Sequence, residues 1–346
     1  MRPGWLRFLL RILGLLGALT IAGCSPARLK GTEGLTAAEV ESLSSLRQVD
    51  PYPLYTLRIS GGDSSSVKEA PLVGFLSAQG RSCAVEVQAC SLFAALGDGN
   101  NPLYGRNFDW DYSPALLLFY QPADGYASAA MVDLDVLGLG GGKAANLTDL
   151  PLKERKVLLE ARFYPYDGMN ERGLAVGMAA VPAGEMVPDP AKATLGSLQV
   201  IREMLDHAAT SDEAIAILEN YNIDMRVGPP LHYLVADSTG HAALVEFYKG
   251  KMTVLTNDHP WHEATNFLLS SVDRPEGNCW RYDRIQARLE ETQGKLSTSQ
   301  GLELLSAVSQ DGTQWSVIYA MKSAEVWVVM GKKYDRVLRF SLKPGS

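Results

Sequence analysis

The sequence has few cysteines and histidines, and it lacks an excess of positive charge. It contains 32 Lys and Arg residues against 39 Asp and Glu residues, which gives a net charge of −7 and a pI near 5.4. Because phosphate binding needs a basic face, this balance argues against a nucleic-acid partner. With 46% hydrophobic and 21% charged residues, the 346-residue chain is long enough to bury a full core in one large domain or two average ones.

The N-terminus carries a short apolar run rather than a full membrane span. Three arginines among the first 11 residues precede the apolar residues 12–22. A charged segment followed by a run of this length is typical of a secretory signal peptide. The ending Ile-Ala-Gly-Cys at 21–24 resembles the bacterial lipobox, in which cleavage precedes a cysteine that carries diacylglycerol. We expect a signal peptide at 1–23, lipid attachment at Cys24 and export to the bacterial cell envelope; an uncleaved N-terminal anchor is the alternative.

Export affects how the four cysteines are interpreted, because oxidising compartments permit disulfides. If Cys24 is lipidated, Cys83, Cys90 and Cys279 remain. Three is an odd number, so at least one thiol stays free unless chains pair between molecules. A Cys83–Cys279 bridge that leaves Cys90 free is one pairing, and the sequence does not choose it over the others.

Sequence patterns for cofactors and metals are also incomplete. The glycine-rich stretch at 138–143 lacks the third glycine of a dinucleotide motif and the Walker spacing, so it is read as a flexible loop. His259 and His262 flank Pro260, which disfavours a helical His-x-x-His geometry, and no Cys or carboxylate cluster completes a ligand set. The sequence therefore predicts no cofactor and no metal.

The predicted elements occur in groups: strands, a helix pair, strands, a second helix pair and strands again. Helices are predicted at 36–46, 195–208, 211–220, 282–292 and 299–308. Beside the strands at 89–112, strands are predicted at 55–59, 72–76, 83–87, 115–121, 129–137, 232–237, 242–247, 252–256, 315–321, 326–330 and 337–342. A turn is predicted at 167–174, followed by an apolar strand through residue 180. Grouped antiparallel strands with paired helices favour helices layered on packed sheets over alternating βαβ units.

The segment 89–112 contains the residues with the clearest chemical potential. Cys90 begins an apolar strand, residues 97–102 supply a turn, and Arg106 and Asp109 lie on the returning strand. A hairpin brings these side chains together, and a guanidinium beside a thiol favours the nucleophilic thiolate. A buried structural cysteine is the alternative. None of the five histidines stands in a pattern that identifies it as the base of a Cys-His mechanism.

A series of motifs in order resembles the choloylglycine hydrolase family of linear amide hydrolases, which includes bile salt hydrolases and penicillin V acylases. The series is Cys90-Ser91-x-Phe93, Gly105-Arg106-Asn107-Phe108-Asp109-Trp110, Asp167-Gly168-Met169-Asn170-Glu171-x-Gly173-Leu174, Val254-Leu255-Thr256-Asn257, Trp280-Arg281-Tyr282 and Thr313-Gln314-Trp315-Ser316-Val317. The resemblance runs from about residue 83 to the C-terminus.

The resemblance implies an α+β fold, a four-layer αββα sandwich of the N-terminal nucleophile hydrolase type, acting on a small-molecule N-acyl amide without a cofactor. In such enzymes the nucleophile is the first residue of the mature chain, and its α-amine, with a pKa near 8, is the base. Carried over by position, Cys90 is the nucleophile and Arg106 stabilises its thiolate. Asp109 orients the α-amine, Asn257 donates to the oxyanion and Arg281 supports the charged site.

Two features depart from the family pattern. Ala180 stands where members often carry a second oxyanion asparagine. Cys90 lies inside the chain, so a free α-amine requires cleavage of the Ala89–Cys90 bond, for which autoproteolysis is the family's route. An acyltransferase to an amine acceptor and an inactive surface binding lipoprotein remain alternatives to a hydrolase.

The chain is accordingly divided into four parts. These are a signal peptide at 1–23, a tether at 24–50, a prosegment or added strands at 51–89 and a catalytic domain at 90–346. Membrane contact is expected through the lipidated N-terminus alone, and the sequence leaves open whether the protein forms a homo-oligomer.

Overall fold

The computed structural model describes residues 31–61, 89–140, 146–226 and 228–343. Cys24, Cys83 and the strands predicted at 72–76 and 83–87 lie outside these residues. The lipid attachment and the disulfide pairing therefore stay predictions. Within the described ranges, no helix has the length and hydropathy needed to cross a bilayer.

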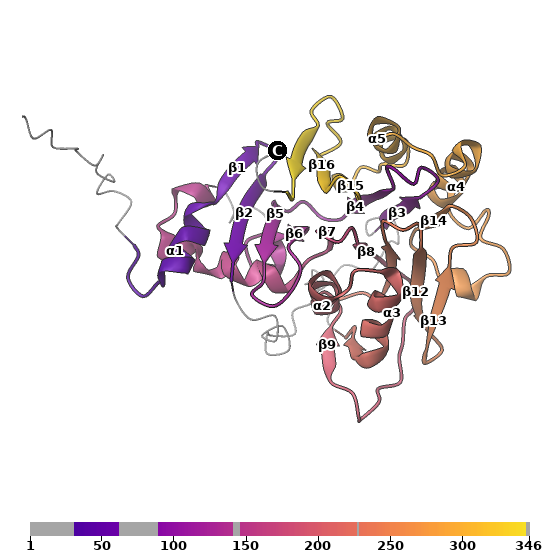
Figure 1. Cartoon of the computed structure of the whole chain (residues 1–346), viewed down its shortest axis with the longest axis horizontal. Helices are drawn as coiled ribbons and strands as arrows, with labels where there is room; N and C mark the ends of the chain where they lie inside the picture. The colour runs from indigo at the N-terminus through magenta and orange to yellow at the C-terminus, as the bar shows by residue number, and fades with distance from the viewer. Residues whose placement is uncertain (1–30, 62–88, 141–145, 227, 344–346) are drawn as a thin grey trace, which may run out of the picture.

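Two sheets form the centre of the molecule (Figure 1). The nine-stranded sheet has the spatial order β1 (Arg47–Asp50), β2 (Leu54–Ser60), β5 (Ala115–Gln121), β6 (Ser128–Asp133), β7 (Asp167–Asn170), β8 (Ala175–Ala180), β11 (Leu231–Ala236), β12 (Ala242–Tyr248) and β13 (Lys251–Thr256). The six-stranded sheet has the order β14 (Trp261–Ala264), β3 (Ala89–Ala95), β4 (Leu103–Asp109), β15 (Thr313–Ala320), β16 (Glu325–Met330) and β17 (Leu338–Ser341). Neighbours in both sheets are antiparallel except β2 and β5, which run parallel.

Helices cover the outer face of each sheet. α2 (Gln199–His207) and α3 (Ser211–Asn220) pack on the nine-stranded sheet, whereas α4 (Trp280–Thr292) and α5 (Thr298–Ala307) pack on the six-stranded one (Figure 1). The inner faces of the sheets meet, and the Tyr104 hydroxyl of β4 donates to the Leu234 carbonyl of β11 at 2.9 Å. The predicted α+β αββα sandwich is confirmed.

Polar caps fix where three helices begin. In α1 (Ala37–Ser44), α3 and α5, the hydroxyl of the N-cap residue accepts a hydrogen bond from the backbone N–H three residues further on. The side chain of that later residue in turn accepts a hydrogen bond from the backbone N–H of the N-cap residue. This reciprocal capping box satisfies N–H groups that have no partner within the helix. The caps are Thr36, Thr210 and Ser297. The N-cap of α3 is therefore Thr210, one residue before Ser211, where the sequence pattern placed the start of the helix.

The strand that carries Cys90 is buried along its whole length. On β3, Cys90, Leu92 and Ala94 belong to the large core between the sheets, whereas Phe93 and Ala95 belong to a second core beneath α4 and α5. Because both faces of β3 are covered, it reads as a continuous apolar run instead of alternating with polar residues. β3 therefore lies in the interior, with Cys90 near its start.

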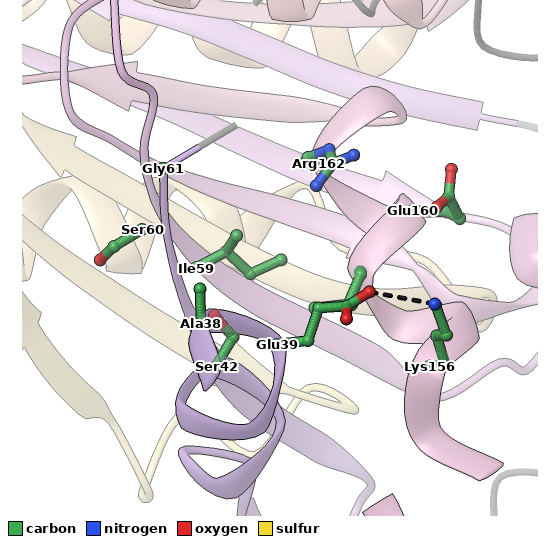
Figure 2. Close-up of a pocket in the computed structure, with 10 residues that line it drawn as sticks. Ala38, Glu39, Ser42, Ile59, Ser60, Gly61, Lys156, Glu160 and Arg162 are labelled. Atoms are coloured by element: carbon green, nitrogen blue, oxygen red, sulfur yellow. Dashed lines mark ion pairs between the residues drawn. The ribbon is translucent and has the colours of Figure 1, made fainter. Parts of the chain in front are cut away.

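Residues before Cys90 form part of the same fold. The sequence assigned 24–50 to a tether, yet residues 37–50 contain α1 and β1, and β2 pairs with β5 over seven residues. Figure 2 shows α1 and β2 beside the 3-10 helix η6 (Leu152–Phe163), with Glu39 of α1 and Lys156 of η6 joined at 3.1 Å. The N-terminal elements thus extend the nine-stranded sheet.

Several boundaries differ from the sequence-based prediction. The strand predicted at 129–137 ends at Asp133, whose carboxylate accepts the Asp135 N–H and caps the 3-10 helix η3 (Leu134–Leu137). The helix predicted at 195–208 begins at Gln199, because residues 194–196 form β9 and pair with β10. The sequence predicted a turn where β7 lies. Other elements that the sequence did not predict are β1, β9 (Thr194–Gly196), β10 (Asn222–Asp224), β14, η6 and the short 3-10 helices η5 (Leu147–Asp149) and η7 (Leu269–Ser271).

Candidate active site

The β3–β4 hairpin brings together three of the predicted site residues. Its register pairs Ala89 with Asp109 and Cys90 with Phe108. The Nη2 of Arg106 donates to the Sγ of Cys90 at 3.6 Å. Cys90, Arg106 and Asp109 therefore lie in one cluster, as the sequence predicted from the hairpin.

Arg106 is a fully buried cation held by a buried acid. Its Nη1 donates to Asp167 of β7, which also accepts hydrogen bonds from the Tyr319 hydroxyl and from the Trp315 indole N–H. Burial acts to lower the pKa of Arg106, but the carboxylate of Asp167 raises it, and the net direction is upward. Arg106 thus stays charged beside the thiol. On β8, a Cβ at Gly177 would meet the Tyr104 hydroxyl at 2.8 Å and the Cδ of Arg106 at 3.3 Å, so glycine leaves room for both side chains.

The thiol itself is held in its protonated form. Burial raises the pKa of Cys90, and the charge of Arg106 opposes that rise without cancelling it. Burial likewise raises the pKa of Asp109, although its carboxylate accepts the Thr313 hydroxyl at 2.5 Å and the Gln310 amide at 2.8 Å. In the chain with an intact Ala89–Cys90 bond, the Cys90 thiol therefore lies beside a cation, while its raised pKa favours the protonated form.

An asparagine that the sequence did not single out contacts the backbone of Cys90. The Cys90 N–H donates to the Oδ1 of Asn266 at 2.6 Å, and the Nδ2 of Asn266 donates to the Ala180 carbonyl at 2.7 Å. Arg281 of α4 donates through Nη2 to the same Oδ1 at 3.0 Å, and through Nη1 to the Cys90 carbonyl and to the Ser91 hydroxyl. Arg281 is thus brought to Cys90, as the sequence predicted.

The segment that carries Asn266 is anchored by a buried pair on the nine-stranded sheet. The Nε2 of His232 lies 2.8 Å from the Thr265 carbonyl, and its Nδ1 lies 3.3 Å from the Oε1 of Glu246. Glu246 also accepts the backbone N–H groups of Leu269 and Ser270, each at 2.8 Å. This polar network fixes the backbone on both sides of Asn266.

The predicted oxyanion donor, Asn257, is engaged elsewhere. Its Oδ1 accepts the Ala242 N–H at 2.7 Å, and its Nδ2 donates to the carbonyls of His259 at 2.7 Å and Gly240 at 3.3 Å. These bonds close the turn that follows β13. The oxyanion role of Asn257 stays a prediction, and Asn266 is the asparagine whose side chain bonds to Cys90.

The cluster combines the groups that acyl transfer through a cysteine requires. It has a thiol, a fixed guanidinium, a carboxylate and an amide oxygen that accepts the Cys90 backbone N–H. Within the described residues, no group of three or more His, Cys, Asp or Glu side chains could hold a metal ion.

Comparison with protein families gives a match at residues 156–268 to the linear amide C–N hydrolases of the choloylglycine hydrolase family. This range includes Asp167, Asn257 and Asn266 but ends before Arg281 and begins after Arg106. A penicillin V acylase from Pectobacterium atrosepticum is 28% identical over 182 residues, which are 48% of this chain and 46% of the relative. The match thus spans about half the length of this curated relative.

Solved structures show the same fold at lower sequence identity. The penicillin V acylase from Agrobacterium tumefaciens has a TM-score of 0.51 at 16% identity and covers 74% of this chain and 89% of its own. A mutant conjugated bile acid hydrolase from Clostridium perfringens has a TM-score of 0.53 at 16% identity, and the match covers 73% of this chain and 92% of the hydrolase. These similarities establish an N-terminal nucleophile hydrolase fold.

Proposed function

We propose that the chain hydrolyses a non-peptide N-acyl amide with Cys90 as its nucleophile, because residues 156–268 match the linear amide C–N hydrolases of the choloylglycine hydrolase family. The observation that carries the proposal is the pair of contacts at Cys90. Arg106 donates to its sulfur, and Asn266 accepts from its backbone nitrogen. Both the nucleophile and its neighbouring amine therefore have a partner in place.

The free amine arises by cleavage of the Ala89–Cys90 bond. The Cys90 sulfur attacks the Ala89 carbonyl, the C–N bond breaks as a thioester forms, and water then hydrolyses that thioester. Ala89 leaves as a carboxylate, and Cys90 retains its thiol and gains an α-amine. Arg281, which donates to the Cys90 carbonyl, keeps the new terminus in position while the bond opens.

In the cleaved enzyme the α-amine serves as the base. It accepts the thiol proton as the sulfur attacks the substrate carbonyl, and it returns a proton to the departing amine. Asn266 accepts from the amine, and the carboxylate of Asp109 on the paired strand orients it. Water hydrolyses the acyl thioester and releases the carboxylic acid. Donors aimed at the oxyanion lower the barrier, and the loss of one costs about a hundred- to a thousandfold in rate.

The cleaved protein is a complex of two chains. The N-terminal chain retains α1, β1 and β2, whose contacts with the catalytic part do not depend on the cut bond. Asp50 pairs with Arg336 at 2.7 Å, and the Tyr52 hydroxyl donates to Gln314 at 2.9 Å. A lipid on Cys24 would then tether the catalytic chain to the envelope membrane through these contacts.

Mass spectrometry of the purified protein tests the mechanism. A chain that begins Cys-Ser-Leu-Phe is expected, together with burst release from a chromogenic phenoxyacetyl or phenylacetyl amide. Cys90→Ala should abolish both. The matched control is Cys279→Ala, which removes the partly exposed thiol and should leave both intact. An intact single chain with full activity would refute the mechanism.

A further inference from the structure

A second cleft lies on the opposite side of the β3–β14 pair from the Cys90 thiol. It has a volume of about 410 Å³ and is bounded by the end of β13, by β14 and by α4. The register pairs Glu263 with Phe93, and directly paired residues share a face of the sheet. Because Phe93 faces α4 and α5 whereas Cys90 faces the other sheet, Glu263 lies on the helical side.

The lining of this cleft is acidic and contains neither lysine nor arginine. Asp258, Glu263 and Glu290 supply carboxylates among its eleven residues. His262 adds no charge: its Nδ1 accepts the Glu263 N–H at 3.0 Å, its Nε2 donates to the Leu255 carbonyl at 2.8 Å, and burial lowers its pKa. The Nε2 of His259 lies 3.8 Å from the Oδ1 of Asp258 at the exposed rim, whereas no side-chain cation of the wall is paired with Glu263.

Glu263 is the buried member of this group. Its side chain is 5% exposed, and its polar partner is the Tyr282 hydroxyl of α4. A carboxylate buried without a cation is costly. Burial raises the pKa of Glu263 to about 7, and the charges of Asp258 and Glu276 add to the rise. The group is thus poised to lose its proton when a cation arrives.

An aromatic surface accompanies the carboxylate. The rings of His259 and Trp261 stack with their centroids 4.8 Å apart, and both residues line the cleft. His259 covers one face of the indole and is the exposed ring of the stack, whereas Trp261 is 8% exposed. The face of an aromatic ring attracts a cation. Hydrogen bonds from an ammonium to a carboxylate are among the stronger ones. Carboxylate and ring together suit an ammonium with an organic substituent better than a metal ion, which prefers several oxygen ligands.

We propose that this cleft binds a small organic ammonium ion, with Glu263 as its counter-ion and the His259–Trp261 stack as its aromatic wall. On binding, the Glu263 carboxyl releases its proton to solvent and keeps the electron pair as a carboxylate facing the ammonium. Two walls of the cleft continue to the Cys90 cluster, because Tyr282 adjoins Arg281 on α4 and Glu263 precedes Asn266 by three residues. An ammonium ion bound in the cleft therefore holds α4, which carries Arg281, against the segment that carries Asn266.

Calorimetric titration of the full chain carrying Cys90→Ala tests binding without turnover. Ethanolamine, putrescine and tetramethylammonium serve as probes, each in buffers of different ionisation enthalpy. At least one should bind saturably, with proton release near neutral pH and affinity rising from about pH 6 to about pH 8. Asp258, Glu276 and Glu290 are exposed carboxylates, and the exposed His259 ring lies beside Asp258. The Glu263 variant separates the contribution of Glu263 from that of these exposed groups.

Glu263→Gln should weaken binding at least about tenfold and abolish the proton release. Because the substitution removes the buried carboxyl and keeps a side chain of similar size, the thermal midpoint of the Glu263→Gln protein should not fall at neutral pH. Gln286→Lys places a competing ammonium at the cleft and should also prevent binding. The matched control is Glu291→Gln, because Glu291 pairs with Arg288 and neither residue lines the cleft. Failure of all three probes to bind, unchanged affinity in Glu263→Gln, or Glu263-dependent binding of Mg²⁺ or Ca²⁺ in place of the amines would each overturn the proposal.

Discussion

Charge and burial oppose each other at the residues around Cys90. A buried guanidinium is tolerated when a carboxylate and hydrogen bonds compensate its lost hydration. Asp167 supplies that compensation and is itself satisfied by Tyr319 and Trp315. Asp167 thereby keeps Arg106 charged and fixed beside the Cys90 thiol.

Asp167→Asn should destabilise the fold strongly, because it leaves Arg106 buried without a counter-charge. Breaking a buried pair from one side costs about 3–5 kcal/mol. Urea unfolding in the Cys90→Ala background measures the loss while excluding processing. Asp311→Asn, which breaks the exposed pair with Lys332, is the matched control and should change the midpoint little. Equal stability of the two variants would contradict the compensating role of Asp167.

The two asparagines can be distinguished by their contacts. Asn266→Ala removes the acceptor that positions the base at the Cys90 nitrogen and a partner of Arg281, so kcat/KM should fall about a hundredfold, mainly through kcat. Asn257→Ala removes the bonds that close the turn after β13, so the thermal midpoint should fall more than kcat. Steady-state kinetics and thermal unfolding of both variants provide the test. If kcat instead fell more in Asn257→Ala than in Asn266→Ala, that result would identify Asn257 as the oxyanion donor.

The sequence predicted those members of the Cys90 cluster that are close to one another along the chain. Arg106 and Asp109 follow Cys90 within one hairpin, and turn chemistry is enough to bring them close. Asn266 comes from the loop after an edge strand that no local pattern predicted, and its approach to Cys90 depends on β14 pairing with β3. Asp167 was recognised as part of a turn motif, but its contact with Arg106 crosses between the two sheets.

At the scale of elements, the loop after β14 is fixed by the network of Glu246 and His232. Burial acts to raise the pKa of Glu246, but its bonds to His232 and Ser270 lower it below the usual 4.5. A carboxyl whose pKa is lowered by folding stabilises the fold above its unfolded value, and that contribution is lost as the pH falls through the folded value. The network therefore holds Asn266 in place at neutral pH.

Glu246→Gln should lower the midpoint of thermal unfolding at neutral pH. The difference from the parent should shrink as the pH falls below about 4.5, because both proteins then lack the charge. Thermal unfolding of the parent and the variant over a pH series measures this convergence. Glu325→Gln, at a partly exposed pair with Arg339, is the control and should show a smaller difference. A gap that stays constant with pH would contradict the role of the carboxylate.

The elements that the sequence missed share a physical cause. Period-two and period-3.6 patterns identify long strands and helices, and the grouped strands with paired helices correctly predicted layered sheets. β9 and β10 have three residues each, too few for a pattern, and they exist because they pair with each other. The 3-10 helix at residues 134–137 continues an apolar run, so only the cap at Asp133 marks the end of the strand.

At the scale of the whole molecule, the site of cleavage divides a single sheet assembly. β2 lies in the nine-stranded sheet between β1 and β5, and its residues Leu54, Leu57 and Ile59 are buried in the shared core. Ala89 begins β3 in the other sheet. The proposed cut therefore separates the chain covalently between two sheets that remain packed together, and the N-terminal chain should not dissociate without unfolding.

The last prediction follows from that retention. In the cleaved protein, both chains should co-elute in native buffer and separate only in denaturant, because buried strand pairing and core contacts join them. With the lipid on Cys24, both chains should fractionate with membranes, and Cys24→Ala should move both into the soluble fraction together. Immunoblots against each chain measure the partition, and Cys279→Ala is the control that should leave it unchanged. A catalytic chain that is soluble while the N-terminal chain stays in the membrane would show that α1, β1 and β2 do not hold the enzyme to its anchor.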